Sequence, residues 1–141
     1  MKTTQPEPTT TAELEAALSG YIGTEHYYTS PTFGTLGLRY TDGIRAMAEI
    51  AGAYWLLDTI HSAAIYNPQF KSGFWSVRME SQDDKGRLLI TFDFQDDGTP
   101  IDSQGNLGKA DFSQEFDYTD FPEGAFNFYI LDGVILLTSE Y

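Results

Sequence analysis

The stretch from Thr41 to Asn67 constrains the fold most, because it is the only long segment that can form one continuous helix. Thr41 or Asp42 can cap its start, and an acidic side chain in the first turn suits the positive end of the helix dipole. Pro68 ends it, since proline disfavours helical geometry in the residue before it. Apolar side chains cover most of its circumference, so we expect a long and mostly buried helix.

Two polar residues, Asp58 and His61, lie within the apolar face of this helix, and Tyr54 lies one turn before Asp58. A buried carboxylate is costly unless it is paired or hydrogen-bonded. One interpretation is a site at the edge of a cleft, in which Asp58 orients His61 as a general base. The other is a structural polar network of the same three side chains that ties the helix to a neighbouring loop. We favour the network, because no motif marks a nucleophile and structural networks perturb residues as active sites do.

After Pro68 the apolar pattern changes from helical to alternating, which is typical of strands. Phe74–Ser81 and Leu88–Gln95 predict a hairpin, and two further strands follow before the Asp132-Gly133 turn. Val134–Leu137 is apolar at every position, which predicts an interior strand or one covered by a helix.

These elements predict an α+β fold, namely an antiparallel sheet of four or five strands packed on one long central helix, with a short N-terminal helix. The short helix is expected over Ala12–Ser19, after a capping box that begins at Thr10. We expect residues 1–10 to form a mobile tail and residues 11–141 to form a single domain.

Composition excludes several classes of site. The sequence has no cysteine, so disulfides and thiolate metal sites are absent. Its two histidines are far apart and match no ligand pattern, and we expect neither a metal nor a cofactor. No apolar leader and no stretch of membrane-spanning length is present, so the expectation is a cytoplasmic protein that does not contact a membrane.

The charge is strongly negative, with 21 Asp and Glu against 8 Lys and Arg, a net of −13. Twelve of the acids and three of the bases lie between Glu80 and Glu123. Direct binding to nucleic acid is therefore not expected, because phosphate contacts need positive charge. A basic protein partner, mimicry of DNA and a simple solvated face all fit the pattern, and the solvated face is the commonest meaning of such a run.

The final hairpin carries more apolar residues than one sheet face needs. Both faces of its last strand are apolar, and a helix can cover only one face of a sheet this size. Uncovered apolar patches usually mark interfaces, and a twofold homodimer is the commonest way to bury one. We expect a homodimer whose interface includes these residues: Tyr129, Leu131, Val134 and Ile135.

Four segments carry a resemblance to a known family: GTEHYY (23–28), YTDG with AGAYWLLD (40–58), DYTDFP (117–122) and DGVILLTSEY (132–141). They resemble an uncharacterised family of small proteins, classed as a domain of unknown function and found in bacteria, plasmids and phages. The resemblance implies a bacterial or mobile-element origin. It implies no activity, cofactor or catalytic residue.

The sequence thus favours a non-catalytic, acidic binding or interaction module of the bacterial cytoplasm. Two alternatives stay open. One is an anti-defence or regulatory protein of a mobile element that mimics DNA. The other is a small enzyme that uses Asp58 and His61.

Overall fold

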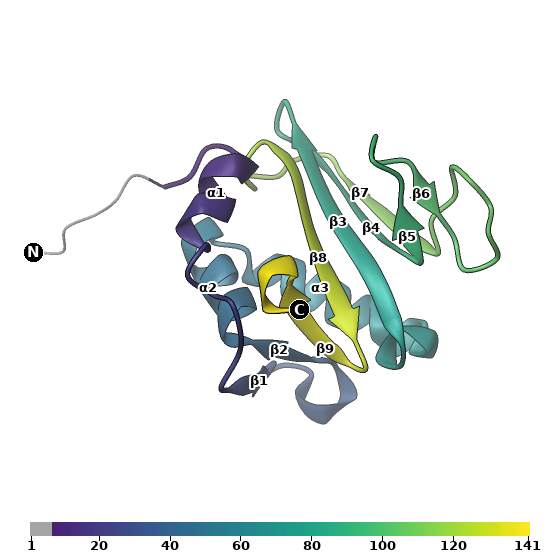
Figure 1. Ribbon diagram of the computed structural model, residues 1–141, viewed down its shortest axis with the longest axis horizontal. Helices are drawn as coiled ribbons and strands as arrows, with labels where there is room; N and C mark the ends of the chain where they lie inside the picture. Colours follow the sequence, from purple (N-terminus) through teal and green to yellow (C-terminus); the bar gives the residue numbers. More distant parts are fainter. Residues whose placement is uncertain (1–6) are drawn as a thin grey trace, which may run out of the picture.

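The computed structural model describes residues 7–141 and shows helices packed against a large sheet (Figure 1). The helices are α1 (Thr11–Ala17), α2 (Asp42–Ala51) and α3 (Tyr54–Tyr66), with short 3-10 turns η1 (Gly34–Leu36), η2 (Pro68–Lys71) and η3 (Thr138–Glu140). The strands are β1 (Tyr27–Thr29), β2 (Arg39–Thr41), β3 (Phe74–Gln82), β4 (Lys85–Thr91), β5 (Asp93–Phe94), β6 (Pro100–Ile101), β7 (Phe112–Phe116), β8 (Gly124–Leu131) and β9 (Val134–Leu137).

The main sheet has seven strands in the order β1-β2-β9-β8-β3-β4-β7. It is mixed, because β2 and β9 run parallel while the other neighbouring pairs are antiparallel. The fold is α+β, but the expected antiparallel sheet of four or five strands is wrong. The extra strands β1 and β2 have three residues each, too few to show an alternating pattern, and β2 joins the sheet by pairing with residues 134 and 135, far away in sequence.

The predicted single long helix is also wrong, because the chain breaks between α2 and α3. Gly52 takes the left-handed conformation (φ 62°, ψ 38°) and ends α2. Its N–H and that of Ala53 both donate to the carbonyl of Ala48, an arrangement that satisfies the last carbonyls of a helix and favours glycine at the left-handed position. Two shorter helices therefore replace it, and in Figure 1 α3 passes behind the strands while α2 lies at one side, next to α1.

The core lies between these helices and the inner face of the sheet. It combines alternate residues of the central strands with the buried sides of α2 and α3. The largest fully buried side chains include Met47, Leu56, Leu57, Ile60, Phe70, Met79, Leu88 and Phe128.

Several local predictions are confirmed. Thr41 caps α2 by accepting the N–H of Ile44 at 3.2 Å. Asp132 and Gly133 both have positive φ (47° and 82°), as a two-residue hairpin turn requires, and β9 is an interior strand between β2 and β8. Of the expected tail, residues 1–6 lie outside the described residues, while Thr10 forms a β-bridge with Glu123, whose N–H donates to the carbonyl of Thr9 and whose carbonyl accepts the N–H of Thr11.

The start of α2 is where three distant segments meet. The Glu140 carboxylate accepts hydrogen bonds from the Thr41 hydroxyl (2.6 Å) and from the Gly43 N–H (3.1 Å). From another side, the Tyr28 hydroxyl donates to Asp42 at 2.8 Å. A carboxylate here satisfies free N–H groups and faces the positive end of the helix dipole. Three of the four segments that carry the family resemblance therefore converge on one helix end.

Candidate functional site

His61, the central residue of the expected site, is fully buried and holds a loop. Its Nδ1 accepts the backbone N–H of Leu38 at 2.9 Å, and its ring lies between those of Phe33 and Tyr40, at centroid distances of 5.6 and 6.2 Å. A Cβ at Gly37 would lie 2.7 Å from the same nitrogen, so the loop can approach this closely only with glycine there. His61 therefore fastens the segment before β2 to α3.

The structure does not join the three candidate residues Tyr54, Asp58 and His61 through hydrogen bonds. The Tyr54 hydroxyl donates to Glu49 at 3.1 Å. Asp58 is exposed, and among residues 7–141 its carboxylate has neither a hydrogen bond nor an ion pair. A general base must come within hydrogen-bond reach of a substrate, which a side chain with no exposed surface does not do.

Because His61 is buried, we expect the free energy of unfolding to depend on pH. Burial lowers the pKa of His61, and the negative charge of Asp58 opposes this shift only in part. The unfolded chain therefore takes up a proton at a higher pH than the folded chain. Stability should be constant above the ordinary histidine pKa and should fall as the pH drops below it, by up to about 1.4 kcal/mol per pH unit.

Urea unfolding over this pH range measures the slope. His61→Asn keeps an acceptor near the position of Nδ1 but does not titrate, so it should flatten the profile. Both proteins should also carry His26→Gln, which removes the other histidine. An unchanged slope in His61→Asn shows that other groups cause the pH dependence.

Asp58 instead lines a groove between α3 and the edge strand β7. Two ring contacts show the relative direction of α3 and β7. The ring of Trp55 packs on that of Phe116, with centroids 5.3 Å apart. The ring of Phe70, just beyond the helix, lies 6.5 Å from that of Phe112. The start of α3 is thus beside the end of β7, and the two elements run in opposite directions.

Between these two contacts lies a hollow of about 430 Å³. Its lining comes from one side of α3, from the residue after it and from β7: Asp58, Thr59, Ser62, Ala63, Tyr66, Asn67, Phe112 and Gln114. Small side chains at Ser62 and Ala63 keep the helix surface low there. The groove exists because bulky residues fill both of its ends and small ones line its middle.

The backbone of β7 is open along this groove. Among residues 7–141, β7 pairs with β4 alone, so alternate N–H and C=O groups face away from the sheet. Ser113, Gln114 and Glu115 are exposed. The β5–β6 arm contacts β3 and β4, and the loop after it is hydrogen-bonded through Ser103 to Asp111, just before β7. The opposite edge, β1, offers only three residues.

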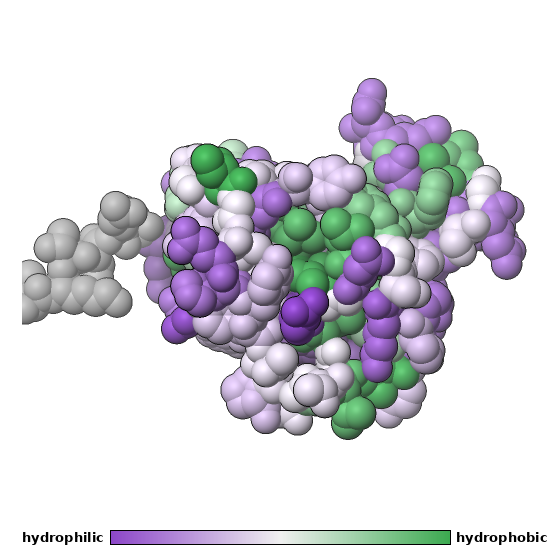
Figure 2. Space-filling model, turned by 60° about the horizontal axis from the view of Figure 1, so that its bottom comes forward, coloured by the Kyte–Doolittle hydropathy of each residue, from purple (hydrophilic) through white to green (hydrophobic). Residues whose placement is uncertain are grey.

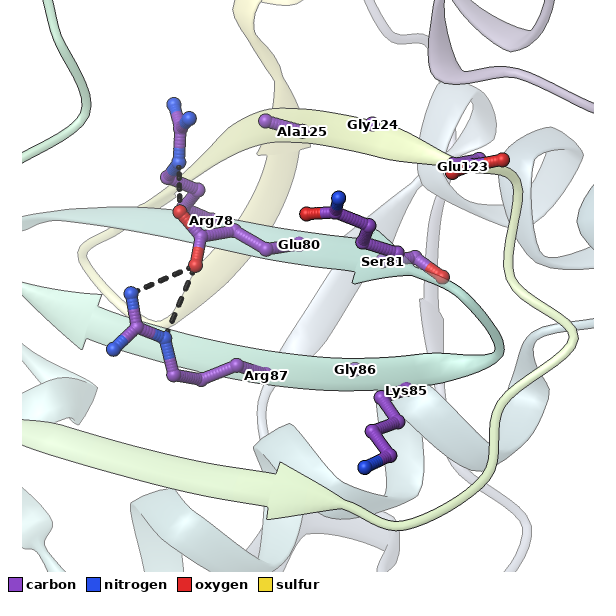
Figure 3. Close-up of a pocket in the computed structure, with 10 residues that line it drawn as sticks. Arg78, Glu80, Ser81, Lys85, Gly86, Arg87, Glu123, Gly124 and Ala125 are labelled. Atoms are coloured by element: carbon purple, nitrogen blue, oxygen red, sulfur yellow. Dashed lines mark hydrogen bonds and ion pairs between the residues drawn. The ribbon is translucent and has the colours of Figure 1, made fainter.

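A second hollow, of about 570 Å³, lies on the outer face of the sheet, and three of the five charged residues that line it bind one another. Figure 3 shows Glu80 between two arginines. Glu80 accepts from Arg78 at 2.8 Å and from two nitrogens of Arg87 at 2.8 and 3.0 Å, and these contacts lower its pKa despite burial. The Arg78 guanidinium also lies 6.0 Å from the ring centre of Phe94, which holds the β5–β6 arm. The network occupies Arg78, Glu80 and Arg87, whereas Lys85 and Glu123, which have opposite charges, also line this hollow and have no ion pair within residues 7–141.

The expected interface residues divide between the two faces of the sheet. Tyr129, Leu131 and Val134 are half-buried on the outer face, whereas Ile135 is fully buried in the core. Tyr129 packs with two exposed rings, those of Phe74 (4.7 Å) and Tyr141 (5.6 Å). Figure 2 shows hydrophobic surface in the middle of this side of the molecule, bordered by hydrophilic residues.

Sequence reasoning named Asp58 but missed the groove. The groove depends on β7 being an edge strand, which no local pattern reveals. The usable signal was Asp58, Ser62 and Tyr66 at intervals of four residues, since such residues form one stripe on a helix.

Within residues 7–141, none of the helices is both long and apolar enough to cross a bilayer. The same residues contain no group of three or more His, Cys, Asp and Glu placed to hold a metal ion. No curated protein and no solved structure matches the chain. The chain matches one family over residues 12–141, which include every element from α1 to η3 apart from the first residue of α1. The chain therefore belongs to this family of unknown function, DUF6876.

Proposed function

We propose that the protein is a non-catalytic binding module that takes an extended segment of a partner protein as an additional strand on β7. The observation that supports this is the open edge of β7 beside a groove floored by α3. Peptide-binding domains use such edges because the main chain supplies affinity and pockets for alternate side chains supply specificity.

The dimensions of the groove suit this mode of binding. Side chains of an added strand alternate between the two sides of the sheet, so every second side chain of the bound segment would face α3. Gln114 lies between Phe112 and Phe116, on the side of β7 that faces the helix. A side chain of the segment that lies beside Gln114 can enter the hollow over Ala63.

The charge of the chain supports a basic protein as the partner. Of its 21 acids, Asp42, Glu49 and Glu80 have ion-pair partners within residues 7–141. The others leave a negative field that attracts basic proteins and repels nucleic acid. We place this role in the bacterial cytoplasm, because the family resemblance implies a bacterial origin and the sequence favours a cytoplasmic location.

Filling the groove tests the proposal. Peptides of about ten residues, long enough to pair with all of β7, are selected from a random display library on the wild-type protein. Ser62→Trp places a ring in the hollow and should weaken the selected peptides by about tenfold or more, a change of about 1.4 kcal/mol. Fluorescence anisotropy measures the affinities.

Ala16→Trp is the matched control, because it adds the same ring at an exposed position of α1, away from the groove. It should leave affinity unchanged. Selected peptides that bind Ser62→Trp as well as wild type, or a selection that enriches no peptide, contradict strand addition on β7.

We further propose that the protein forms a homodimer through the outer face of the sheet around Tyr129, Leu131 and Val134. The exposed rings of Phe74 and Tyr141 beside Tyr129 support this, because clustered apolar surface usually marks an interface. Sedimentation equilibrium should give twice the mass of the chain and, for Tyr129→Lys, a monomer. A wild-type protein that stays monomeric at high concentration excludes the dimer.

A further inference from the structure

We infer that the segment bound on β7 carries a lysine or arginine at the position that faces Asp58, and a small or apolar residue two positions along. This inference rests on the proposed strand addition and names the chemistry of the partner. The inference rests on the charge of Asp58, on the spacing between Asp58 and Tyr66 along α3, and on the exposure of both side chains.

Charge selects the side chain that meets Asp58. Asp58 is the only charged residue among those that line the hollow, and none of them is basic. A strand laid on β7 would remove water from this carboxylate, which costs free energy unless a positive group replaces the water. A neutral segment leaves Asp58 unpaired, and an acidic one adds repulsion.

Spacing sets the pattern of the bound segment. Asp58 and Tyr66 are eight residues apart on α3, which corresponds to about 12 Å along a helix. Four residues of an extended strand cover about 13 Å. The side chains at the first and fifth positions of a segment therefore match Asp58 and Tyr66. The third position falls midway, at Ser62 and the neighbouring Ala63, whose small side chains leave the hollow that this side chain would fill.

Tyr66 offers a second contact to a basic side chain. Its ring is 82% exposed, the largest exposure among the large hydrophobic residues of the described chain. A cation over an aromatic face is attracted by the ring quadrupole, and the side-chain stem packs on the ring. A second basic residue, four positions from the first, fits this end of the groove.

The chain itself uses this chemistry elsewhere. The Arg45 guanidinium lies 4.7 Å from the ring centre of Tyr28 and donates to Glu49 at 3.3 Å. Arg78 similarly combines a ring, that of Phe94, with the carboxylate of Glu80. In the groove the carboxylate and the ring are present on α3, and the cation would come from the partner.

Three synthetic peptides of one design test the inference. The first is Thr-Lys-Thr-Val-Thr-Lys-Thr with an N-terminal fluorescein, and the other two carry Gln or Glu in place of both Lys residues. Anisotropy titrations compare wild type with Asp58→Asn and with Asp96→Asn. Asp96 is exposed in the β5–β6 arm, so its change alters net charge equally at a distance from the groove.

The wild-type protein should bind the Lys peptide most tightly, the Gln peptide less tightly and the Glu peptide most weakly. Asp58→Asn should weaken the Lys peptide by about three- to fivefold, the usual range for a partly exposed ion pair, and leave the Gln peptide unchanged. Asp96→Asn should change the Lys peptide by much less. This difference separates a contact at Asp58 from general attraction to an acidic protein.

Two other results are informative. Strand addition stands if the Gln peptide binds wild type and Ser62→Trp blocks this binding. The role of Asp58 is overturned if Asp58→Asn and Asp96→Asn lower the affinity of the Lys peptide equally. If none of the three peptides binds, the inference fails, and the peptides selected from the display library decide whether strand addition on β7 fails with it.

Discussion

Truncation of Leu57 to alanine should lower the free energy of unfolding by about 2–5 kcal/mol, the usual range for a buried leucine. Leu57 is 1% exposed and packs in the core between α3 and the sheet. The loss combines the transfer free energy of the removed methyl groups with the cost of the cavity they leave. Urea denaturation, read by circular dichroism and by tryptophan fluorescence, measures it.

Leu36→Ala is the matched control, because Leu36 is 68% exposed in a short turn of the chain. The same truncation there should change stability by less than about 0.5 kcal/mol. Equal effects of the two substitutions would mean that the side of α3 assigned to the core faces solvent.

Removal of the Glu140 carboxylate should have the second large effect. Glu140→Ala leaves the Gly43 N–H and the Thr41 hydroxyl without their acceptor, and both residues are buried. Hydrogen bonds to a charged group contribute about 1.5–3 kcal/mol each, and buried donors left unpaired add a penalty. Because Glu140 is half-buried, water can replace part of the lost acceptor, so we expect a loss of about 2–4 kcal/mol in urea denaturation, less than the sum of these terms. Glu140→Gln, which keeps an acceptor but not the charge, should lose less.

Two further substitutions assign this loss to the start of α2. Thr138→Ala, at an exposed position of the same short turn, should be nearly neutral. Gly43→Ala would place a Cβ 2.6 Å from a Glu140 oxygen and should disrupt the same contact. The double substitution Gly43→Ala with Glu140→Ala should therefore cost less than the sum of the two. Additive losses show that Glu140 does not act through Gly43.

Features set by neighbouring residues could be predicted from the sequence. The cap at Thr41 and the turn at Asp132-Gly133 are both as expected. Features set by distant contacts could not. Whether Gly52 sits inside a helix or ends one depends on the sheet behind it, because glycine adopts either conformation.

The same limit applies to the candidate site. Asp58 and His61 are three residues apart, which places them about 60° apart around a helix. The sequence predicts that both are on the apolar face, but the structure puts His61 in the core and Asp58 at its rim. Which of two such neighbours meets solvent depends on where the sheet ends. Here the sheet ends at β7, which the strand order of the structure shows and no local sequence pattern predicts.

The parallel pairing of β2 with β9 has a consequence for how the chain folds as it leaves the ribosome. β1 and β2, with three residues each, have only each other as partners until residues 134–137 are synthesised. A two-stranded ribbon this short is not stable alone, so the segment that ends at Thr41 stays open while about ninety more residues emerge. Its apolar side chains, Leu38 and Tyr40, are available to chaperones during that time. Insertion of β9 between β2 and β8 then closes the sheet in a single late step.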